Sequence, residues 1–261
     1  MRDVLAFDIE TIPDVELGRR LHGLEDAPDS DVAEILFSQR RQQSRGGSDF
    51  LSHPLHRVIA ISMVLRNRDR LRLWSIGEPE TPERELLLRF FEGIEQFKPD
   101  LVSWNGHGFD LPVLHYRCLR HGVSAPTYWD TGRLHNDFRW NNYRNRYHGR
   151  HTDLMDMLAG HQLRASATLE ETARLLGLPG KYGLQGDEIW RRYLEGDMDA
   201  IRQYCEIDAL LTYLIYLRYD LMRGLLSDRR YEEEIKRVRK LLKESDGEHL
   251  RRFRENWPAP E

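Results

Sequence analysis

Two acids separated by a single residue, Asp8 and Glu10, follow an apolar run near the start of the chain. The run from Val4 to Phe7 leads directly into them, which predicts a buried strand that ends with two carboxylates. Because side chains alternate along a strand, Asp8 and Glu10 would share one face. Neighbouring carboxylates repel each other and raise at least one pKa unless a cation lies between them, so the pair could bind a hard divalent metal ion. The alternative is a solvated strand end whose acids face water.

A second candidate acid, Asp110, closes a segment that starts at Trp104 and contains Gly106 and Gly108. The two glycines would let the backbone approach a ligand closely. Asp110 falls where the next helix is predicted to begin, and a helix N-terminus stabilises a negative charge. Asp110 could therefore be a metal ligand, or it could only cap the helix after a glycine-rich turn.

A third acid, Asp208, lies in a predicted helix from Asp199 to Met222 and follows Tyr204 by one helical turn. The same helical face continues through the apolar residues Ile201, Leu211 and Ile215. Asp208 thus takes a position where the periodicity favours an apolar residue, and a buried carboxylate needs a compensating partner. That partner would be a metal ion or, alternatively, an Arg or Lys elsewhere in the core. Tyr204 by itself could be an ordinary core tyrosine.

The composition describes a well-solvated chain with enough apolar residues for one core. Of 261 residues, 40% are apolar and 31% are charged, and the formal net charge of −4 gives no overall basic signal for nucleic acid. Cys118 and Cys205 lack C-x-x-C spacing, so neither a disulfide framework nor a zinc site is expected. The N-terminus has no basic-then-apolar leader, and no run reaches the roughly 18 apolar residues of a membrane span. We therefore expect a soluble, cytoplasmic protein without a membrane partner.

The elements that must position these acids form an α/β pattern with a mixed sheet. The predicted strands are Val4–Ile9, Val58–Leu65, Arg70–Ile76, Asp100–Trp104 and a short strand at His151–Asp153. Arg70–Ile76 alternates charged and apolar residues, as an edge strand does. The first predicted helix is opened by Thr81-Pro82, has an apolar stripe from Leu86 to Phe97 and is ended by Lys98-Pro99. The others are Leu111–Arg120, one opened by a capping box at Thr168–Glu171, Glu188–Leu194 and Asp199–Met222.

Two segments lie outside this predicted core. Residues 14–50 form a polar insertion with helical pieces at Val15–Leu21 and Asp31–Gln39, and the composition of Gln39–Ser48 is typical of a mobile surface loop. Residues 224–261 form a charged tail that is predicted to be helical. The main domain would therefore comprise residues 1–223.

The three acidic segments together resemble the exonuclease motifs of the DEDD (DnaQ-like) superfamily. They occur in the order Phe7-Asp8-Ile9-Glu10-Thr11, Asn105 to Asp110 and Tyr204 to Asp208, and the last one is similar to the subgroup with a tyrosine in its third motif. More narrowly, the chain resembles stand-alone bacterial proteins related to the proofreading domain of family B DNA polymerases, over about Val4 to Arg218. The resemblance implies a ribonuclease H-like mixed sheet flanked by helices, with a helical C-terminal extension.

The resemblance also implies a role for each motif residue. Asp8, Glu10 and Asp208 would hold the ion that activates water, and Asp8 with Asp110 the ion that stabilises the leaving oxygen. Tyr204 would orient the attacking water. Oxygen ligands alone favour two Mg²⁺ or Mn²⁺ ions over zinc.

Several further residues are expected to contact the nucleic acid. Family precedent puts Thr11 and Ile12 against the 3′-terminal nucleotide, and Asn105 and Phe109 along the unpaired strand. Lys181 resembles a lysine that meets the phosphate in some proofreading domains, although it could be an ordinary surface lysine.

The stretch from Arg133 to His151 interleaves cations with aromatic rings, which is the composition of single-strand grooves. Its members are Arg133, Arg139, Trp140, Tyr143, Arg144, Arg146, Tyr147 and Arg150. We expect Arg144 and Arg146 to bind nucleic acid, with a solvated loop as the alternative. We expect Asp153 and Asp156, which follow, to cap a helix or support the site instead of enlarging the metal cluster.

The expected function is a metal-dependent 3′-5′ exonuclease that releases nucleoside 5′-monophosphates from single-stranded DNA or frayed 3′ ends. RNA is an open alternative, because discrimination by the 2′-hydroxyl depends on close contacts that a sequence does not place. A non-catalytic nucleic-acid-binding module of the same fold is a second alternative, which loss of any of the five motif residues would favour.

Overall fold

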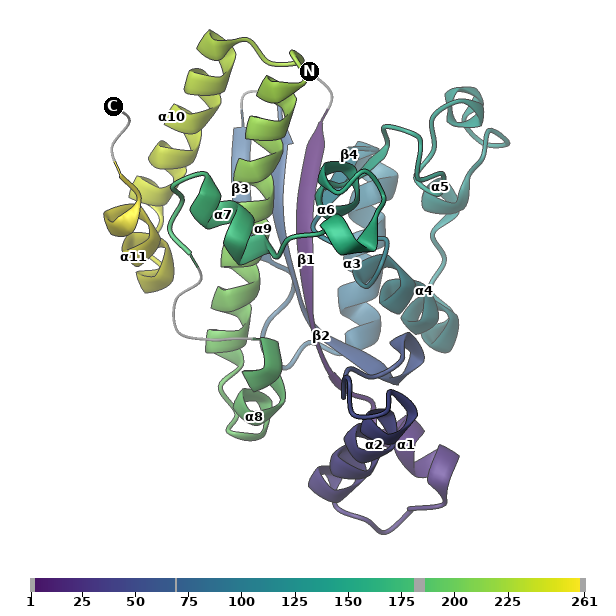
Figure 1. The fold of residues 1–261 in the computed structure, drawn as a ribbon. Coiled ribbons are helices and arrows are strands. Elements are labelled where there is room, and N and C mark those ends of the chain that lie inside the picture. Colours follow the sequence, from purple (N-terminus) through teal and green to yellow (C-terminus); the bar gives the residue numbers. More distant parts are fainter. Residues whose placement is uncertain (1–2, 69, 181–185, 259–261) are drawn as a thin grey trace.

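The computed structural model describes residues 3–68, 70–180 and 186–258, which fold as a mixed sheet between helices (Figure 1). The five strands are β1 (Val4–Pro13), β2 (His56–Asn67), β3 (Arg70–Ser75), β4 (Asp100–Ser103) and β5 (His151–Asp153). Their order across the sheet is β3-β2-β1-β4-β5, so β1 lies at the centre and β3 at one edge. β1 is antiparallel to β2 and parallel to β4, which confirms the predicted α/β class and the ribonuclease H-like mixed sheet.

Long helices cover both faces of the sheet. The α-helices are α1 (Val15–His22), α2 (Asp29–Gln43), α3 (Glu83–Phe97), α4 (Asp110–His121), α5 (Pro126–Trp129), α6 (Leu154–Leu158), α7 (Leu169–Leu175), α8 (Ile189–Leu194), α9 (Met198–Met222), α10 (Asp228–Glu244) and α11 (Glu248–Asn256). Figure 1 shows α9 running along one face of the sheet, and α3 and α4 on the other side of β1. Single turns of 3-10 helix are η1 (His53–Leu55), η2 (Asn136–Arg139), η3 (Leu163–Ala165) and η4 (Gly186–Glu188).

The side chains of β1 divide between these two layers as alternation requires. Val4 and Ala6 pack in the cluster that contains α9, whereas Phe7 and Ile9 pack with α3 and α4. Asp8 and Glu10 continue the row of Val4 and Ala6, so the prediction that they share one face is confirmed.

The prediction that β1 ends near Ile9 is wrong. The strand continues to Pro13 because β2 pairs with it along its whole length. The register shifts between Glu10, which is opposite Ala60, and Thr11, which is opposite Val58, so the extra residue is Ile59 and the bulge lies in β2 beside the second acid. A bulge twists the strand and changes the direction of the side chains beyond it.

The two helices expected in the polar insertion are present and pack against each other. A Cβ on Gly18 of α1 would lie 2.8 Å from Cγ1 of Val32 in α2, so the two backbones approach closely. α2 continues to Gln43, which makes the expected loop over Gln39–Ser48 wrong for its first half, since Arg and Gln are good helix formers.

The C-terminal helices α10 and α11 complete the core on the α9 side. Val238, Leu242 and Phe253 are fully buried in the same cluster as the apolar face of α9. Glu234 of α10 accepts two hydrogen bonds, of 2.7 and 2.6 Å, from the buried guanidinium of Arg66 in β2. The helical conformation predicted for this segment is confirmed.

Within the described ranges, no helix has the length and hydropathy needed to cross a bilayer.

Candidate active site

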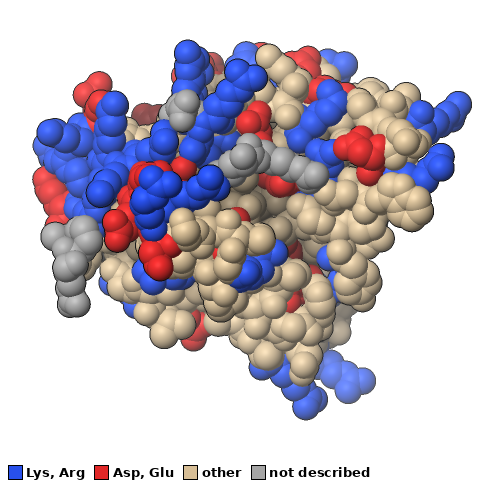
Figure 2. Space-filling model, turned by 90° about the horizontal axis from the view of Figure 1, so that it is seen from above, with Lys and Arg blue, Asp and Glu red and all other residues tan. Residues whose placement is uncertain are grey.

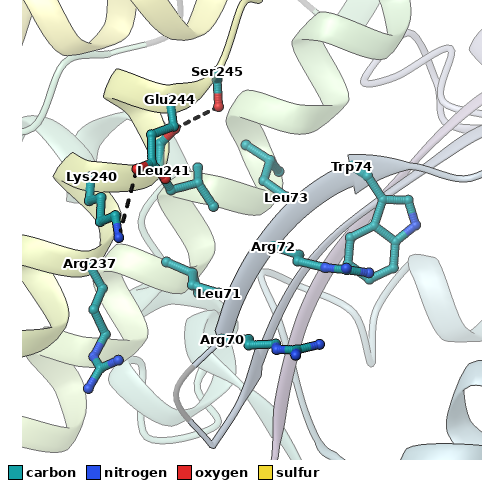
Figure 3. Close-up of a pocket in the computed structure, with 10 residues that line it drawn as sticks. All are labelled: Arg70, Leu71, Arg72, Leu73, Trp74, Arg237, Lys240, Leu241, Glu244 and Ser245. Carbon is teal, nitrogen blue, oxygen red and sulfur yellow. Dashed lines mark hydrogen bonds and ion pairs between the residues drawn. The ribbon is translucent and has the colours of Figure 1, made fainter.

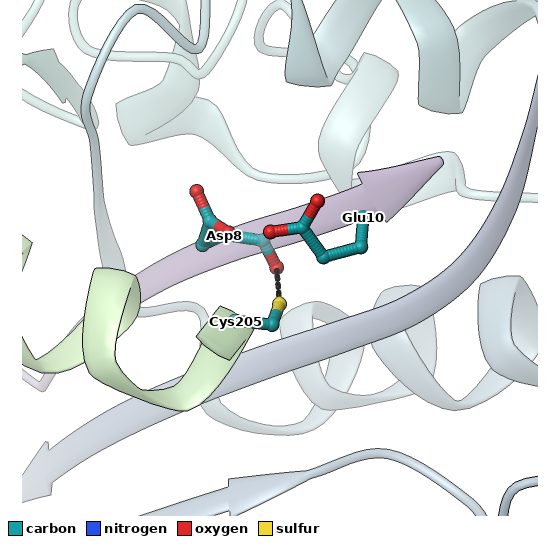
Figure 4. Close-up of side chains that lie close together, drawn as sticks. All are labelled: Asp8, Glu10 and Cys205. Carbon is teal, nitrogen blue, oxygen red and sulfur yellow. Dashed lines mark hydrogen bonds between the residues drawn. The ribbon is translucent and has the colours of Figure 1, made fainter. Parts of the chain in front are cut away.

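β1 and α9 bring Asp8, Glu10 and Cys205 together. One potential ligand atom from each residue lies within 4.8 Å of the other two. Figure 4 shows the two acids extending from β1 and Cys205 approaching from α9. Glu10 is buried, so at least part of this group is shielded from water.

Cys205 acts as a thiol in this cluster. Its Sγ donates a hydrogen bond to the main-chain oxygen of Asp8 at 3.3 Å, which ties α9 to β1. Complete burial raises the pKa of the Cys205 thiol well above its usual value, and the carboxylates of Asp8, Glu10 and Asp208 raise it further. A protonated thiol is a poor ligand for a hard cation, so the carboxylates are the candidate metal-binding groups of this cluster. Sequence reasoning missed this residue, because a neutral thiol on a helix carries no sign of a partner 197 residues away.

Asp110 joins the site from the first turn of α4. It is buried, and burial is the main reason that its pKa rises from 3.8 to about 7. The carboxylates of Asp153 and Asp208 raise this pKa further, while hydrogen bonding to the backbone of Asp110 itself and of Ile9 lowers it. Asp110 therefore lies beside β1 and is repelled by the Asp208 carboxylate of α9. Its predicted position at a helix N-terminus is confirmed.

Asp208 and Tyr204 lie one turn apart on α9, and both are buried. Asp208 is only 5% exposed, which confirms the prediction that it takes a core position of the helix. Tyr204 packs in a small apolar cluster with Ile12 and Ile201. Among the described residues, the ligand atoms of this cluster that lie within 4.8 Å of one another belong to Asp8, Glu10 and Cys205. The acids Asp110 and Asp208 interact with the cluster electrostatically.

These four carboxylates suit a hard divalent cation. Burial and the nearby carboxylates of Asp153 and Asp208 make the charged form of Asp110 costly, as its raised pKa shows, and a cation would remove that cost. The donors are oxygen atoms, which Mg²⁺ and Mn²⁺ prefer.

A proton should leave Asp110 when metal binds. Because its pKa in the metal-free protein is about 7, the group is mostly protonated below that pH, and metal binding requires the carboxylate. The affinity for Mn²⁺ is therefore expected to fall about tenfold for each pH unit below 7. Isothermal titration calorimetry in buffers of different ionisation enthalpy should show about one proton released at roughly pH 6 and few at roughly pH 8. Asp110→Asn should abolish this difference in proton release between the two pH values. Equal release at both pH values in the unaltered protein would contradict the loss of a proton from Asp110 on metal binding.

The same raised pKa predicts how stability depends on pH without metal. The folded protein binds a proton at Asp110 that the unfolded chain does not bind between about pH 4 and 7. This group's contribution to the free energy of unfolding is therefore expected to decline as the pH rises through that interval.

A second group of potential ligands, His107, Asp153 and Asp156, lies in the loop before α4 and at the start of α6. Asp153 accepts hydrogen bonds from the main-chain N–H groups of Asn105, at 3.0 Å, and His107, at 2.8 Å. It also caps α6 through the N–H of Asp156, which confirms the expected capping role. Asp153 thereby fixes the loop that leads to Asp110. The three side chains could also hold a metal ion, and sequence reasoning gave no role to His107.

Three of the residues expected to contact nucleic acid, Thr11, Ile12 and Phe109, already pack against or hydrogen-bond to other parts of the protein. The Thr11 hydroxyl lies 2.8 Å from Nδ1 of His56. Phe109 packs edge-on against the rings of His56 and Phe50, with ring centroids 5.0 and 5.1 Å away. The side chain of Ile12 is buried.

Asn105 belongs to the loop before α4. Asn105 has a left-handed backbone with φ of 60°. Lys181 lies outside the described residues.

The aromatic and basic stretch from Arg133 to His151 is only partly exposed. Tyr143 is fully buried and donates a hydrogen bond to the carbonyl of Pro99, and Arg150 is buried over the ring of Phe138. The expectation that these two members face a nucleic acid is therefore wrong, because composition does not distinguish a core tyrosine or a buried arginine from exposed ones.

Other members of the stretch do reach the surface. Trp140 and Tyr147 are each 78% exposed. Arg144 stacks over the ring of Trp129, and Arg146 pairs with Asp156 at 3.0 Å.

The sheet order and the acids supplied by β1, α4 and α9 define an α/β protein of ribonuclease H-like fold with a buried carboxylate site. The chain belongs to the family described as "Predicted 3'-5' exonuclease related to the exonuclease domain of PolB", whose model matches residues 48–257. The matched range includes Asp110, Tyr204 and Asp208 as well as α10 and α11, and it begins after Asp8 and Glu10.

The chain is also similar to a DNA polymerase from Archaeoglobus fulgidus. The two are 27% identical over 161 residues, which is 60% of this chain and 19% of the polymerase. The matched part therefore spans about a fifth of the length of that relative.

Proposed function

We propose that this 3′-5′ exonuclease hydrolyses the terminal phosphodiester bond of single-stranded or frayed DNA and releases nucleoside 5′-monophosphates. The electrostatic coupling of buried acids from three separate elements is the observation that carries this function. Asp208 raises the pKa of Asp110, and both lie beside the strand that carries Asp8 and Glu10. Such an arrangement of like charges is unfavourable without a cation and is typical of a functional site.

In this mechanism two Mg²⁺ or Mn²⁺ ions would be held by Asp8, Glu10, Asp110 and Asp208. When bound, they would supply an activated water and stabilise the charge on the leaving oxygen. Tyr204, one turn before Asp208 on α9, would orient the attacking water through its hydroxyl. The fixed backbone of β1 and the N-terminus of α4 keep the acids in place, so little reorganisation is needed during the reaction.

The substrate is proposed to be DNA. The similarity to a DNA polymerase supports this choice, and so does the family's relation to the exonuclease domain of PolB. The 3′ end would be held by Thr11, Ile12, Asn105, Phe109 and Lys181. Exposed cations such as Arg144 and Arg146 would hold the strand further along.

The tyrosine before Asp208 supports assignment to the DEDD subgroup with a tyrosine in its third motif, among the stand-alone bacterial proteins. We assign the exonuclease domain to residues 1–223 and treat residues 224–261 as its helical extension. A cytoplasmic location completes the proposal.

A gel assay with 5′-labelled single-stranded DNA and RNA of one sequence tests this function. A ladder that shortens from the 3′ end with Mg²⁺ or Mn²⁺, and is absent with EDTA, is expected, with faster shortening of DNA. Faster shortening of RNA would favour an exoribonuclease. Retarded DNA without any ladder would favour a non-catalytic binding module and would contradict the proposed reaction.

A DNA duplex provides the matched substrate control. A duplex with an unpaired 3′ end should be trimmed faster than the same duplex fully paired, because the terminal nucleotide must leave the duplex before it can enter the site. Equal rates on the two duplexes would contradict a preference for frayed ends.

A further inference from the structure

A groove of about 620 Å³ lies between β3 and α10 (Figure 3). β3 supplies one wall with the residues from Arg70 to Trp74, and α10 supplies the other with Arg237, Lys240, Leu241 and Glu244. These four positions recur at intervals of three and four residues, so they form one face of the helix. None of the residues proposed to bind metal lines this groove.

The strand in this groove has an open edge. β3 pairs with β2 and ends the sheet order, so its second side faces no strand among those described. The N–H of Ile76 donates to the carbonyl of Ile61, its partner in the register, at 2.8 Å. In an antiparallel pair this pattern repeats every second residue, so the main-chain groups of Arg70 and Arg72 face β2, while those of Leu71 and Leu73 face outward.

The two rows of side chains on β3 differ in chemistry. Arg70 and Arg72 are exposed, and neither forms an ion pair with a described carboxylate. Leu71 and Leu73 point toward α10, where Leu241 lies, as Figure 3 shows. An open strand edge thus has a basic row on one side and an apolar row on the other.

The charge around the groove is positive although the chain as a whole is acidic. Arg70 and Arg72 extend from β3 away from α10, as Figure 3 shows. On the α10 side, Arg237 lies 3.5 Å from Glu234, and Lys240 lies 3.7 Å from Glu244, the one acid among the residues that line the groove. Seen from above, Lys and Arg side chains gather on the side of the molecule that carries α10 (Figure 2). With a net charge of −4, this concentration is local.

We propose that the groove binds an extended acidic peptide segment of a partner protein, which adds to β3 as a further strand. Its main chain would pair with the outward groups of Leu71 and Leu73, and this pairing provides affinity for any peptide. Because side chains alternate, acidic residues at every second position would meet Arg70 and Arg72, and apolar residues between them would meet Leu71, Leu73 and Leu241. The groove therefore selects a segment in which acidic and apolar residues alternate.

A peptide fits these features better than a nucleic acid does. Phosphates would pair with the arginines, but they would not use the apolar row or the main-chain donors and acceptors of the strand edge. An edge strand of six residues matches a partner segment of similar length.

Fluorescence anisotropy with a labelled peptide of about seven residues, alternating Glu and Val, tests the proposal directly. The peptide is expected to bind the full-length protein, and a peptide with the same residues in a block order, four Glu followed by three Val, is expected to bind about tenfold more weakly. Methylation of alternate main-chain nitrogens is the sharper probe. One set of methylated positions faces β3 and should abolish binding, whereas the other set faces away and should leave binding unchanged.

Variants of the protein test the location of the peptide. Arg72→Glu is expected to weaken binding about tenfold, since it replaces an attraction with a repulsion. Lys240→Glu should weaken it several-fold, and Lys243→Glu is the matched control, because it makes the same charge change on the same helix outside the groove. The nuclease activity of these variants on a short single strand, measured without peptide, should match that of the unaltered protein.

Three outcomes would overturn the proposal. The first is equal binding of the alternating and block peptides, and the second is an equal effect of the two methylation sets. The third is that a non-cleavable single-stranded DNA, in EDTA, displaces the peptide and that Arg72→Glu weakens the binding of this DNA as well. The last outcome would make the groove a nucleic-acid surface. None of these results depends on cleavage, so the proposed exonuclease function is tested separately.

Discussion

Replacing Asp208 with alanine is expected to reduce the rate of 3′-end cleavage by at least about a thousandfold while leaving the fold intact. The change removes a proposed metal ligand whose charge also acts on Asp110 and Cys205. Without metal, the loss of one of several repelling acids should leave the free energy of unfolding unchanged or slightly higher. Asp208→Ala should therefore lower the rate of cleavage without lowering the metal-free stability.

Three measurements check this prediction. A single-turnover assay gives the rate of cleavage, circular dichroism with EDTA gives the stability, and thermal unfolding with Mn²⁺ gives the stabilisation that metal provides, which the variant should lose. The variant should also lower the pKa of Asp110, because Asp208 is one of the groups that raise it.

Asp220→Asn is a suitable control for Asp208→Ala. Asp220 is another buried acid of α9, but it pairs with Arg223 at the far end of the helix. Cleavage by this control should be unchanged. Cleavage at the unaltered rate by Asp208→Ala would refute the proposed site.

Replacing Arg117 with methionine is expected to lower the free energy of unfolding by about 3–5 kcal/mol. Arg117 of α4 is buried and forms ion pairs with the buried carboxylates of Asp14 and Glu83. Glu83 also accepts a hydrogen bond from the main-chain N–H of Val58 in β2, at 2.7 Å. Methionine would fill a similar volume but would remove the cation that both buried carboxylates share, which is the costly way to break a buried ion pair. Only Arg120, 3.9 Å from Asp14, and His121, 2.7 Å from Glu83, would stay beside them.

The cost should depend on pH. Although burial alone would raise the pKa of Asp14, its hydrogen bonds to Leu17 and Arg117 and the charges of Arg117 and Arg120 lower it below 3.8. In the unaltered protein this stabilisation is present above pH 3.8 and is lost as the pH falls through the lowered pKa of the folded state. In the variant the unpaired acids can be protonated instead. The difference in stability between the two proteins should therefore narrow as the pH falls toward 4.

Chemical denaturation at several pH values measures this difference. Arg89→Met is the control, since Arg89 forms an exposed pair with Glu85, and it should change the free energy of unfolding by less than about 1 kcal/mol. A similar small effect of Arg117→Met at neutral pH would show that the buried network contributes little to stability.

The features that could be predicted from the sequence depend on local physics. Alternation alone places Asp8 and Glu10 on one face of a strand and marks Arg70–Ile76 as an edge, because the period of a strand is two residues. The capping box at Thr168 and Glu171 is present with both of its hydrogen bonds. Helical spacing likewise identifies Asp208 as a polar residue in an apolar face of α9.

The features that could not be predicted depend on contacts between distant segments. Asp14 and Arg117 are 103 residues apart, and the local sequence around each is typical of a surface charge, yet the fold buries them together. The same holds for Arg66 and Glu234, which are 168 residues apart. Tyr143 carries no local sign that a fold will enclose it.

Cys205 and His107 show the same limit within the site itself. Both occur inside motif segments, yet their partners come from other elements: the carbonyl of Asp8 for Cys205 and the ring of His151 for His107. A single sequence identifies the charged residues that are proposed as ligands, because acids in apolar surroundings are unusual. The neutral groups that hold those ligands in place have no such signal.

The thiol of Cys205 reaches the carbonyl of Asp8 across 197 residues of chain, and this separation governs when activity can arise during synthesis. Asp8 leaves the ribosome early, but its partner Cys205 on α9 follows 197 residues later. Domains fold as units during translation, and contacts between distant segments form last. A nascent chain that stops before α9 would therefore lack Tyr204, Cys205 and Asp208, so the site could not form until α9 has been made.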